Sequence, residues 1–343
     1  MKRPMTEIVG NDDLKARLAD DILAGTLPHA CIIEGARGTG KHTIARMCAA
    51  ALACSCKSDK SKAIPCLFCY DCKKVLEGKS PDLILIGSEG KASIGVETIR
   101  FLREDVRLIP NDLDHKIYVI EDADKMTHQA QNAFLLTLEE PPEYVRFFLL
   151  CENAGLLLET IRSRAPIHRT EPIDTELIDE YICAHDRRAA QMKLSAPKDY
   201  AELLKAAGNG IGTALEYLDP KTFAPVLERR RFALEFVKIA TEGGGNRDVL
   251  NVISKFSSKR DVLRDQLSMV SLAVRDLILL KKTDNAPLCF FVDRNEAIEL
   301  CDRVSLPFLF RLGEAISRAI EENAQNANVR LAIIHLATFA ELL

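Results

Sequence analysis

In the first half of the chain, short apolar runs alternate with segments of helical periodicity. Short, nearly continuous apolar runs are predicted to be strands at residues 30–34, 83–86, 117–120 and 147–151. Unbroken runs of β-branched and aromatic residues are typical of parallel strands that are covered on both faces. Amphipathic helical segments, such as 127–138, lie between them. This half therefore predicts an α/β domain, a parallel sheet with helices on both faces.

Beyond about Pro166 the strand pattern nearly vanishes and helical periodicity replaces it. Short helices are expected at 176–184, 201–207 and 213–218, and longer ones at 226–241, 247–257, 260–281, 295–304, 308–323 and 327–343. Glycines 243–245 and Pro287 mark breaks between the longer segments. We expect three domains: an α/β nucleotide-binding domain at 1–167, a small helical domain at 168–222, and an all-α domain at 223–343.

Composition narrows the classes of protein to consider. The 343 residues are 47% hydrophobic, which is ample for a sizeable core, and the formal net charge is −4. A strongly basic nucleic-acid-binding module is therefore excluded, and DNA contact must come from local patches or partner chains. No apolar run reaches the roughly 18 residues of a membrane span, and residues 1–7 do not resemble a signal peptide. We expect a cytoplasmic protein whose eleven cysteines are reduced or bind metal.

A glycine-rich segment between the first predicted strand and the next helix has the form of a phosphate-binding loop. Glycines let backbone N–H groups surround phosphate oxygens, a lysine supplies charge, and the helix N-terminus adds its partial positive charge. The alternative is a strand-to-helix turn that binds nothing. Ser or Thr usually follows the lysine and holds Mg²⁺; an imidazole there suits softer metals and puts magnesium in doubt. The candidate residues for ATP or ADP are Gly35, Gly38, Thr39, Gly40, Lys41, His42 and Thr43.

The strand predicted at 117–120 ends in Glu121 and Asp122. Carboxylates at this place can orient magnesium and polarise an attacking water. The usual order is Asp then Glu, so the reversed pair predicts a degenerate acidic site, with Asp122 one methylene short as a base. The alternative is a solvated strand end without function.

A cluster of cysteines predicts a structural zinc site. Cys66, Cys69 and Cys72 form two overlapping C-x-x-C pairs, and either Cys54 or Cys56 could supply a fourth sulfur. Four thiolates around tetrahedral Zn²⁺ leave no open position for catalysis. The alternatives are a redox-active pair or free buried thiols. The Lys/Ser-rich stretch 57–62 predicts a projecting knuckle loop.

Together these motifs resemble the clamp-loader branch of the AAA+ ATPases. The resemblance runs from residue 9 to about 164 and includes Leu-Pro-His-Ala at 27–30, the phosphate loop, the cysteine insert and the Asn-Ala-Phe-Leu-Leu-Thr-Leu-Glu-Glu-Pro-Pro segment at 132–142. It implies an AAA+ domain, a helical lid and an all-α oligomerisation collar, whose last helix the 326–332 segment resembles. In the family the first zinc cysteine lies thirteen residues after the loop lysine, which favours Cys54.

Ser163-Arg164-Ala165 resembles the family's Ser-Arg-Cys motif. The resemblance implies that Arg164 acts as an arginine finger in trans, stabilising charge on the phosphoryl group in a neighbouring subunit's nucleotide site. The alternative is an ordinary helix-end arginine that caps backbone carbonyls.

The remaining differences favour one class of subunit within this family. Gly212 stands where the gamma/tau motor subunits carry a nucleotide-contacting arginine, and Glu152 or Asn153 stands at their sensor threonine. A chain that keeps the arginine finger but lacks several residues of a hydrolytic site resembles the delta-prime class more than the motor class. This implies gamma/tau and delta subunits as partners in a hetero-pentamer that loads the sliding clamp on primed DNA. An ATP-hydrolysing motor and a non-replicative AAA+ scaffold remain as alternatives.

Overall fold

The computed structural model describes residues 5, 8–58, 63–88, 93–242, 246–283, 285–325 and 327–339. The described chain forms two compact units. Unit 1 comprises residues 1–178 together with Asn209–Gly212, and unit 2 comprises Asp179–Gly208 with Thr213–Leu343. The glycine break at 243–245 and most of the predicted knuckle loop at 57–62 lie outside the described residues.

Unit 1 is built on a five-stranded parallel sheet with the order β2-β3-β4-β1-β5. All four predicted strands are present, which confirms the α/β class. A fifth, three-residue strand was missed because its Ile-His-Arg sequence carries no apolar run. The strands are β1 (Ala30–Glu34), β2 (Leu83–Ile86), β3 (Lys116–Ile120), β4 (Val145–Cys151) and β5 (Ile167–Arg169).

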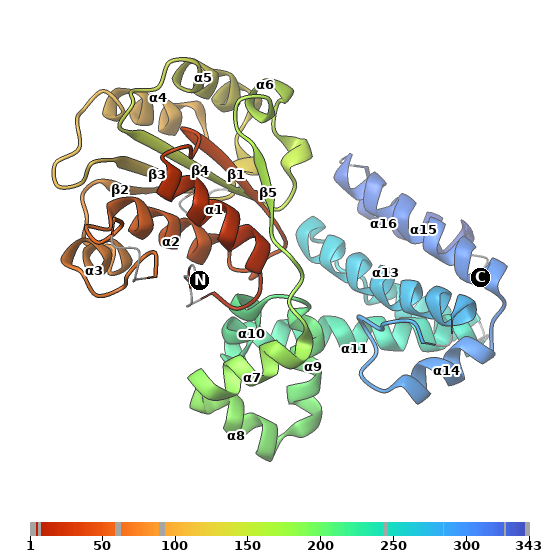
Figure 1. Ribbon diagram of the computed structural model, residues 1–343. Coiled ribbons are helices and arrows are strands. Elements are labelled where there is room, and N and C mark those ends of the chain that lie inside the picture. Colours follow the sequence, from red (N-terminus) through yellow and green to blue (C-terminus); the bar gives the residue numbers. More distant parts are fainter. Residues whose placement is uncertain are drawn as a thin grey trace. The chain divides into compact units, whose positions relative to one another are not determined.

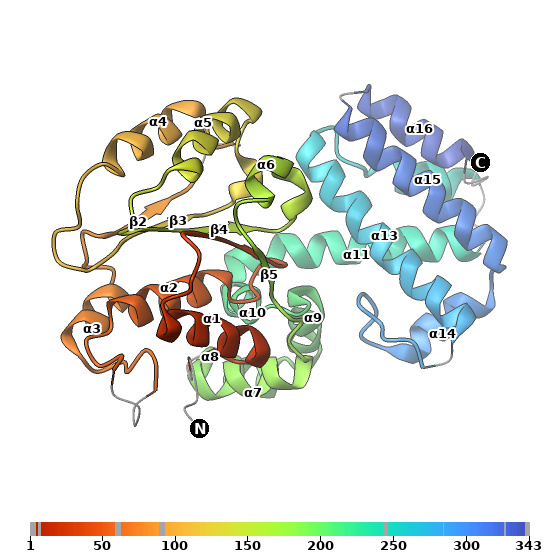
Figure 2. The same cartoon turned by 45° about the horizontal axis from the view of Figure 1, so that its top comes forward.

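Helices cover both faces of this sheet, as the unbroken apolar strands predict. Figures 1 and 2 show α1, α2 and α3 on one face and α4, α5 and α6 on the other. Two short 3₁₀ segments, Ala123–Lys125 and Ala154–Leu156, follow β3 and β4. The helices are α1 (Asp12–Ala24), α2 (Lys41–Ala53), α3 (Tyr70–Leu76), α4 (Val96–Asp105), α5 (His128–Glu139) and α6 (Glu159–Arg162).

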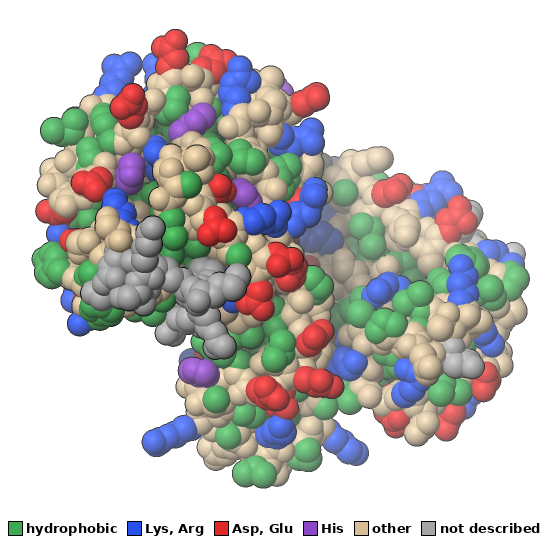
Figure 3. Space-filling view, viewed as in Figure 1, with side chains coloured by type: hydrophobic (Ala, Val, Ile, Leu, Met, Phe, Trp, Pro, Cys, Tyr) green, Lys and Arg blue, Asp and Glu red, His purple; other side chains and the backbone are tan. Residues whose placement is uncertain are grey.

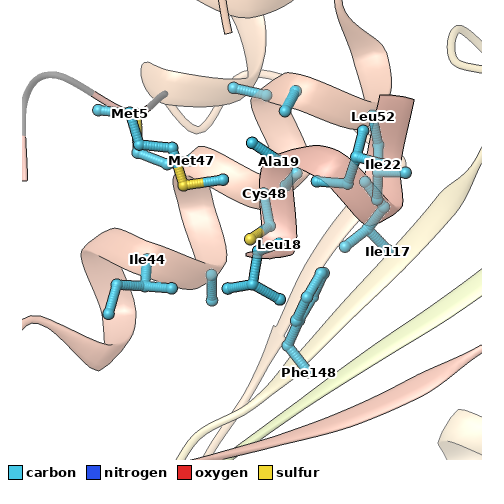
Figure 4. Packing of buried hydrophobic residues seen from close by; sticks show 14 of the residues in the cluster. Met5, Leu18, Ala19, Ile22, Ile44, Met47, Cys48, Leu52, Ile117 and Phe148 are labelled. Carbon is cyan, nitrogen blue, oxygen red and sulfur yellow. The ribbon is translucent and has the colours of Figure 1, made fainter. Parts of the chain in front are cut away.

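Alternate residues of each central strand enter different cores, because successive side chains point to opposite faces of a sheet. In β1, Cys31 and Ile33 join the cluster under α1 and α2, while Ile32 joins the cluster under α4 and α5. Figure 4 shows the first cluster, in which Leu18 and Phe148 are packed between helices and sheet. The sheet is thus held from both sides, and its carboxyl edge becomes a fixed platform for the loops that follow the strands.

A buried carboxylate fixes the loop that leads into β3. Asp82 is fully buried, and its two carboxylate oxygens accept N–H groups of Asn111, Asp112 and Leu113 at 2.7–2.9 Å. Hydrogen bonds to a charged group are stronger than neutral ones, and leaving buried donors unpaired is costly. Asp82 therefore ties the start of β2 to the segment before β3.

Replacing Asp82 by asparagine should lower the free energy of unfolding of unit 1 by about 2–3 kcal/mol, because the charge and one acceptor oxygen are lost. Denaturant unfolding followed by circular dichroism measures this change. The matched control is Asp114→Asn in the same loop, whose side chain is 80% exposed; its effect should stay below about 1 kcal/mol. Equal effects of the two substitutions would contradict this role of Asp82.

Unit 2 is entirely helical in its described residues, as the sequence predicts. Helix α7 begins in unit 1 and continues into unit 2, and α10 also contains residues of both units. The core of unit 2 lies among α11, α13, α14 and α15, with α16 packed against α15. The helices are α7 (Thr175–His185), α8 (Arg187–Ser195), α9 (Pro197–Ala207), α10 (Ile211–Tyr217), α11 (Pro220–Glu242), α12 (Asn246–Ser254), α13 (Arg260–Lys282), α14 (Arg294–Asp302), α15 (Leu306–Ala324) and α16 (Val329–Phe339).

One predicted helix start was wrong. Helix α11 begins at Pro220 and passes through Pro225, whereas the sequence interpretation placed its start after Pro225. Proline is favoured at a first helical position, and the Asp219 carboxylate accepts the N–H of Lys221 at 2.9 Å. This capped start and the buried Phe223 outweigh the one hydrogen bond that Pro225 removes.

Charge is mixed on the surface. On the face shown in Figure 3, basic and acidic side chains are interspersed over both units. This agrees with the formal net charge of −4. Within the described part of the chain, no helix is long and apolar enough to span a bilayer.

Candidate nucleotide and metal sites

The phosphate loop lies at the carboxyl end of β1, between Glu34 and the start of α2 at Lys41. Gly38 and Gly40 have φ angles of 78° and 91°, a left-handed conformation that side chains with a Cβ rarely adopt. These residues turn the chain directly into the N-terminus of α2, where unpaired N–H groups favour anions. The local structure is therefore that of an anion-binding loop.

The lysine of this loop forms hydrogen bonds with backbone carbonyls of the same loop. The Nζ of Lys41 donates hydrogen bonds to the carbonyl oxygens of Gly35 and Ala36 at 2.6 and 2.8 Å. Burial lowers the pKa of Lys41, while nearby acidic groups, with Glu152 the strongest, act in the opposite direction. These two bonds use two of the three N–H donors of the ammonium and fix its position in the loop.

The loop is also held from the neighbouring strand. Thr39 Oγ1 donates to the Ala36 carbonyl at 2.8 Å and accepts a hydrogen bond from Thr170 Oγ1 at 3.0 Å. Thr170 follows β5, and a Cβ placed on Gly35 would lie 1.9 Å from its Oγ1. The sequence interpretation missed Thr170, because an isolated threonine after a three-residue strand gives no signal.

His42 and the first of the two predicted acids meet in space. The Nδ1 of His42 lies 3.0 Å from Glu121 Oε1, and the two side chains are 55% and 35% exposed. The histidine therefore contacts one of the two carboxylate oxygens of Glu121. His42, which the sequence interpretation placed where a magnesium ligand is expected, thus pairs with the first residue of the predicted acidic pair.

The second predicted acid is directed to a different partner. Asp122 has φ 51°, and its Oδ2 lies 2.9 Å from Lys125 Nζ. Two positions further on, Asp124 Oδ2 accepts the backbone N–H groups of Glu152 and Asn153 at 3.0 and 3.1 Å. Asp124 therefore ties the end of β3 to the predicted sensor position after β4. It was not singled out from the sequence, although it closes the same acidic run.

The segment Asn209–Gly212 lies against the phosphate loop within unit 1. The N–H of Gly212 donates to the Gly38 carbonyl at 3.0 Å. A Cβ on Gly210 would lie 2.5 Å from the Arg37 carbonyl oxygen, so this close approach requires glycine. The position that the resemblance assigns to a nucleotide-contacting arginine is thus beside the loop, and here it offers only backbone.

Arg164 lies beyond the end of α6 with its side chain 37% exposed. Its Nη2 is 3.1 Å from Glu139 Oε1, and its Nη1 donates to the Thr160 carbonyl at 3.1 Å. The second contact is the carbonyl cap of the alternative interpretation. The first links the Ser-Arg-Ala motif to the Leu-Glu-Glu-Pro-Pro segment, two motifs that the sequence interpretation treated separately.

The four cysteines of the predicted zinc site converge. Among the residues that the structure describes, the Sγ atoms of Cys54, Cys66, Cys69 and Cys72 all lie within 4.8 Å of one another, and Cys56 does not belong to the group. A tetrahedral Zn–S distance of about 2.3 Å implies S–S separations of about 3.8 Å. The Cys66–Cys72 separation of 4.0 Å is close to that value. The donor set and its geometry fit one zinc ion.

Two of these sulfurs accept hydrogen bonds from backbone N–H groups, which favour the thiolate form. The N–H of Cys69 donates to Cys66 Sγ, and that of Cys72 to Cys69 Sγ, both at 3.4 Å. Burial raises the pKa of the Cys69 thiol, but the hydrogen bonds to its sulfur outweigh burial and lower it to about 6. Thiolate is the form that binds metal. Bound zinc would supply a structural crosslink between the end of α2 and the start of α3.

Comparison with known proteins shows which proteins this chain is similar to. Residues 10–174 match the family described as DNA polymerase III, delta subunit. The DNA polymerase III subunit tau of Escherichia coli K12 is 32% identical over 227 residues, covering 63% of this chain and 33% of that protein. The delta' subunit of Bacillus subtilis is 31% identical over 194 residues, covering 56% of this chain and 57% of that one.

The matched region therefore spans only about a third of the tau relative. Among solved structures, a DNA polymerase III gamma subunit-related protein from Thermotoga maritima aligns over 95% of this chain and 98% of its own, with 19% identity and a TM-score of 0.48.

Proposed function

We propose that this chain is a member of the DNA polymerase III clamp-loader subunit family and that, within this family, it is a delta-prime-like subunit. It joins gamma/tau and delta subunits in a hetero-pentamer and offers Arg164 to the nucleotide site of a neighbouring ATPase subunit. The assembly opens the sliding clamp and loads it on primed DNA. The chain itself acts as a stator rather than as a motor.

The geometry of Arg164 carries this proposal. A finger in trans must keep its charge, remain accessible and be held only loosely until the neighbour's nucleotide arrives. The Arg164 side chain is 37% exposed, and its guanidinium pairs with Glu139, whose side chain is 49% exposed. Exposed ion pairs of this kind contribute about 0–1 kcal/mol, so Arg164 can exchange Glu139 for a phosphate at little cost. Glu139 then serves to hold the finger in place before assembly.

The chain's own nucleotide site supports the stator role. His42 lies on Glu121, Lys41 is bonded to carbonyls of its own loop, and Gly212 contributes no side chain. These features weaken a hydrolytic site: one oxygen of Glu121 is already paired, two of the three N–H donors of Lys41 are used by the loop, and position 212 lacks an arginine side chain. The loop can hold ATP or ADP as a structural ligand without robust turnover.

The second candidate is an ATP-hydrolysing motor, because the tau relative is 32% identical to this chain. The purified chain with Mg²⁺ and ATP distinguishes the two. We expect no phosphate release above that of the Lys41→Ala variant. Turnover by the chain alone that Lys41→Ala abolishes would contradict the stator role and favour the motor.

A further inference from the structure

Unit 1 has a pocket of about 370 Å³ at the edge of the sheet opposite the phosphate loop. It lies near the amino ends of β1, β3 and β4, whereas the phosphate loop follows the carboxyl end of β1. Its volume falls at the lower end of the range for small-molecule sites. The apolar part of its wall includes Ile22 and Leu52, both labelled in Figure 4, and Leu23. This pocket plays no part in the proposed nucleotide chemistry.

Three basic side chains also line this pocket: Lys57, His115 and Arg146. Lys57 comes from the chain that follows the first zinc cysteine, His115 directly precedes β3, and Arg146 lies at the start of β4. Lys57 Nζ lies 3.4 Å from the carboxylate of Asp114, whose side chain is 80% exposed. The positive charge of the pocket is therefore only partly compensated within the described chain.

Two buried nitrogen atoms of these side chains lack a hydrogen-bond partner among the described residues: Arg146 Nε and His115 Nδ1. Arg146 Nη1 is used, since it donates to the carbonyls of Glu143 and Val145 at 2.7 and 2.8 Å. Buried polar nitrogens are almost always paired, so an unpaired nitrogen on each of two residues that line one pocket points to a partner that a ligand supplies. The Nε of Arg146 can only donate, whereas His115 Nδ1 donates or accepts according to its tautomer.

The electrostatics of the pocket agree with this geometry. Burial lowers the pKa of His115, and the positive charges of Arg146 and Lys57 lower it further, while Asp114 and a backbone contact from Tyr144 oppose them. Burial also lowers the pKa of Arg146. Both cationic forms are thus destabilised in the isolated chain, and a bound negative group would stabilise them.

We propose that this pocket binds a small organic oxyanion with a short aliphatic body. The phosphate or carboxylate head would contact Arg146, Lys57 and His115, because guanidinium groups bind such heads in a fixed, directional geometry. The aliphatic body would lie against Ile22 and Leu23. The proposal does not rest on the proposed function, since it involves neither Arg164 nor the phosphate loop.

Isothermal titration of the full chain with four probes tests the proposal. Hexyl phosphate and hexanoate carry both head and body, inorganic phosphate carries the head alone, and hexanol the body alone. At least one of the first two should bind ten times more tightly than either half-probe, and the stronger of them identifies the preferred head. If neither complete anion binds with a Kd tighter than about 1 mM, the proposal is overturned.

Exposed positions allow variants that keep the fold. Lys57→Glu and Leu23→Glu change side chains that are 41% and 43% exposed, and each should weaken binding at least tenfold by placing negative charge at the pocket. Lys198→Glu, a matched charge reversal at an exposed residue of α9, should leave binding unchanged. Circular dichroism confirms that each variant is folded. If neither Lys57→Glu nor Leu23→Glu changes the Kd of the probe, the probe binds elsewhere and the proposed site is refuted.

Discussion

Replacing Arg164 by alanine should slow ATP hydrolysis by the reconstituted clamp loader about 10³-fold, as loss of an arginine finger does in other nucleotide-hydrolysing assemblies. The cause would be lost stabilisation of charge on the phosphoryl group in the neighbouring subunit's site. Assembly should persist, because among the described residues of its own chain Arg164 makes only one exposed ion pair and one carbonyl contact. Steady-state phosphate release and gel filtration of the complex measure the two effects.

Arg162→Ala is the matched control, since Arg162 is also basic and exposed and lies only two residues away at the end of α6. It should leave the rate within about twofold. Glu139→Gln should also leave catalysis nearly intact, because an exposed pair contributes about 0–1 kcal/mol. If Arg164→Ala and Arg162→Ala give the same rate as wild type, Arg164 is only a helix-end cap and the finger role is lost.

Removing zinc should destabilise unit 1 more than the Asp82→Asn substitution does. The ion would join the end of α2 to the start of α3, and Cys72 is fully buried in the core under α1 and α2. Structural zinc contributes about 10 kcal/mol or more in small domains. Loss of even half of that value should lower the melting temperature of unit 1 by at least about 10 °C.

Metal analysis and thermal unfolding of Cys72→Ser and Cys56→Ser test this prediction. Wild type and Cys56→Ser should carry about one zinc per chain, whereas Cys72→Ser should lose it and melt early. A wild-type protein that is metal-free and equally stable would show that the four sulfurs are ordinary buried thiols. Zinc lost from Cys56→Ser but retained by Cys72→Ser would contradict both the assignment of Cys72 as a ligand and the exclusion of Cys56.

Much of the fold could be predicted because local pattern determines it. Unbroken apolar runs predicted β1 to β4, and the spacing of Cys66, Cys69 and Cys72 predicted that their sulfurs would meet. β5 could not be predicted, since three residues of mixed polarity form a strand only when a sheet edge is already present. The start of α11 was misplaced because Pro225 was given more weight than the cap at Asp219.

The contacts that matter most at the candidate site join residues far apart in sequence. His42 was interpreted as a poor magnesium ligand and Glu121 as part of a degenerate acidic pair, and the two side chains contact each other. Likewise, Glu139 and Arg164 belong to different motifs and are 25 residues apart, yet they form an ion pair. Sequence spacing carries no information about such pairs, because the sheet and its covering helices decide which strand ends lie side by side. Only the tertiary structure brings them together.

We propose above all that this chain is a clamp-loader subunit whose Arg164 acts on the nucleotide bound by a neighbouring subunit. Reconstitution with gamma/tau and delta subunits, followed by loading of the sliding clamp on primed DNA, tests it most directly. We expect loading when the chain is present, little loading when it is omitted, and little loading with Arg164→Ala despite normal assembly. A chain that fails to join the complex, or loading that proceeds equally well without it, would contradict the claim.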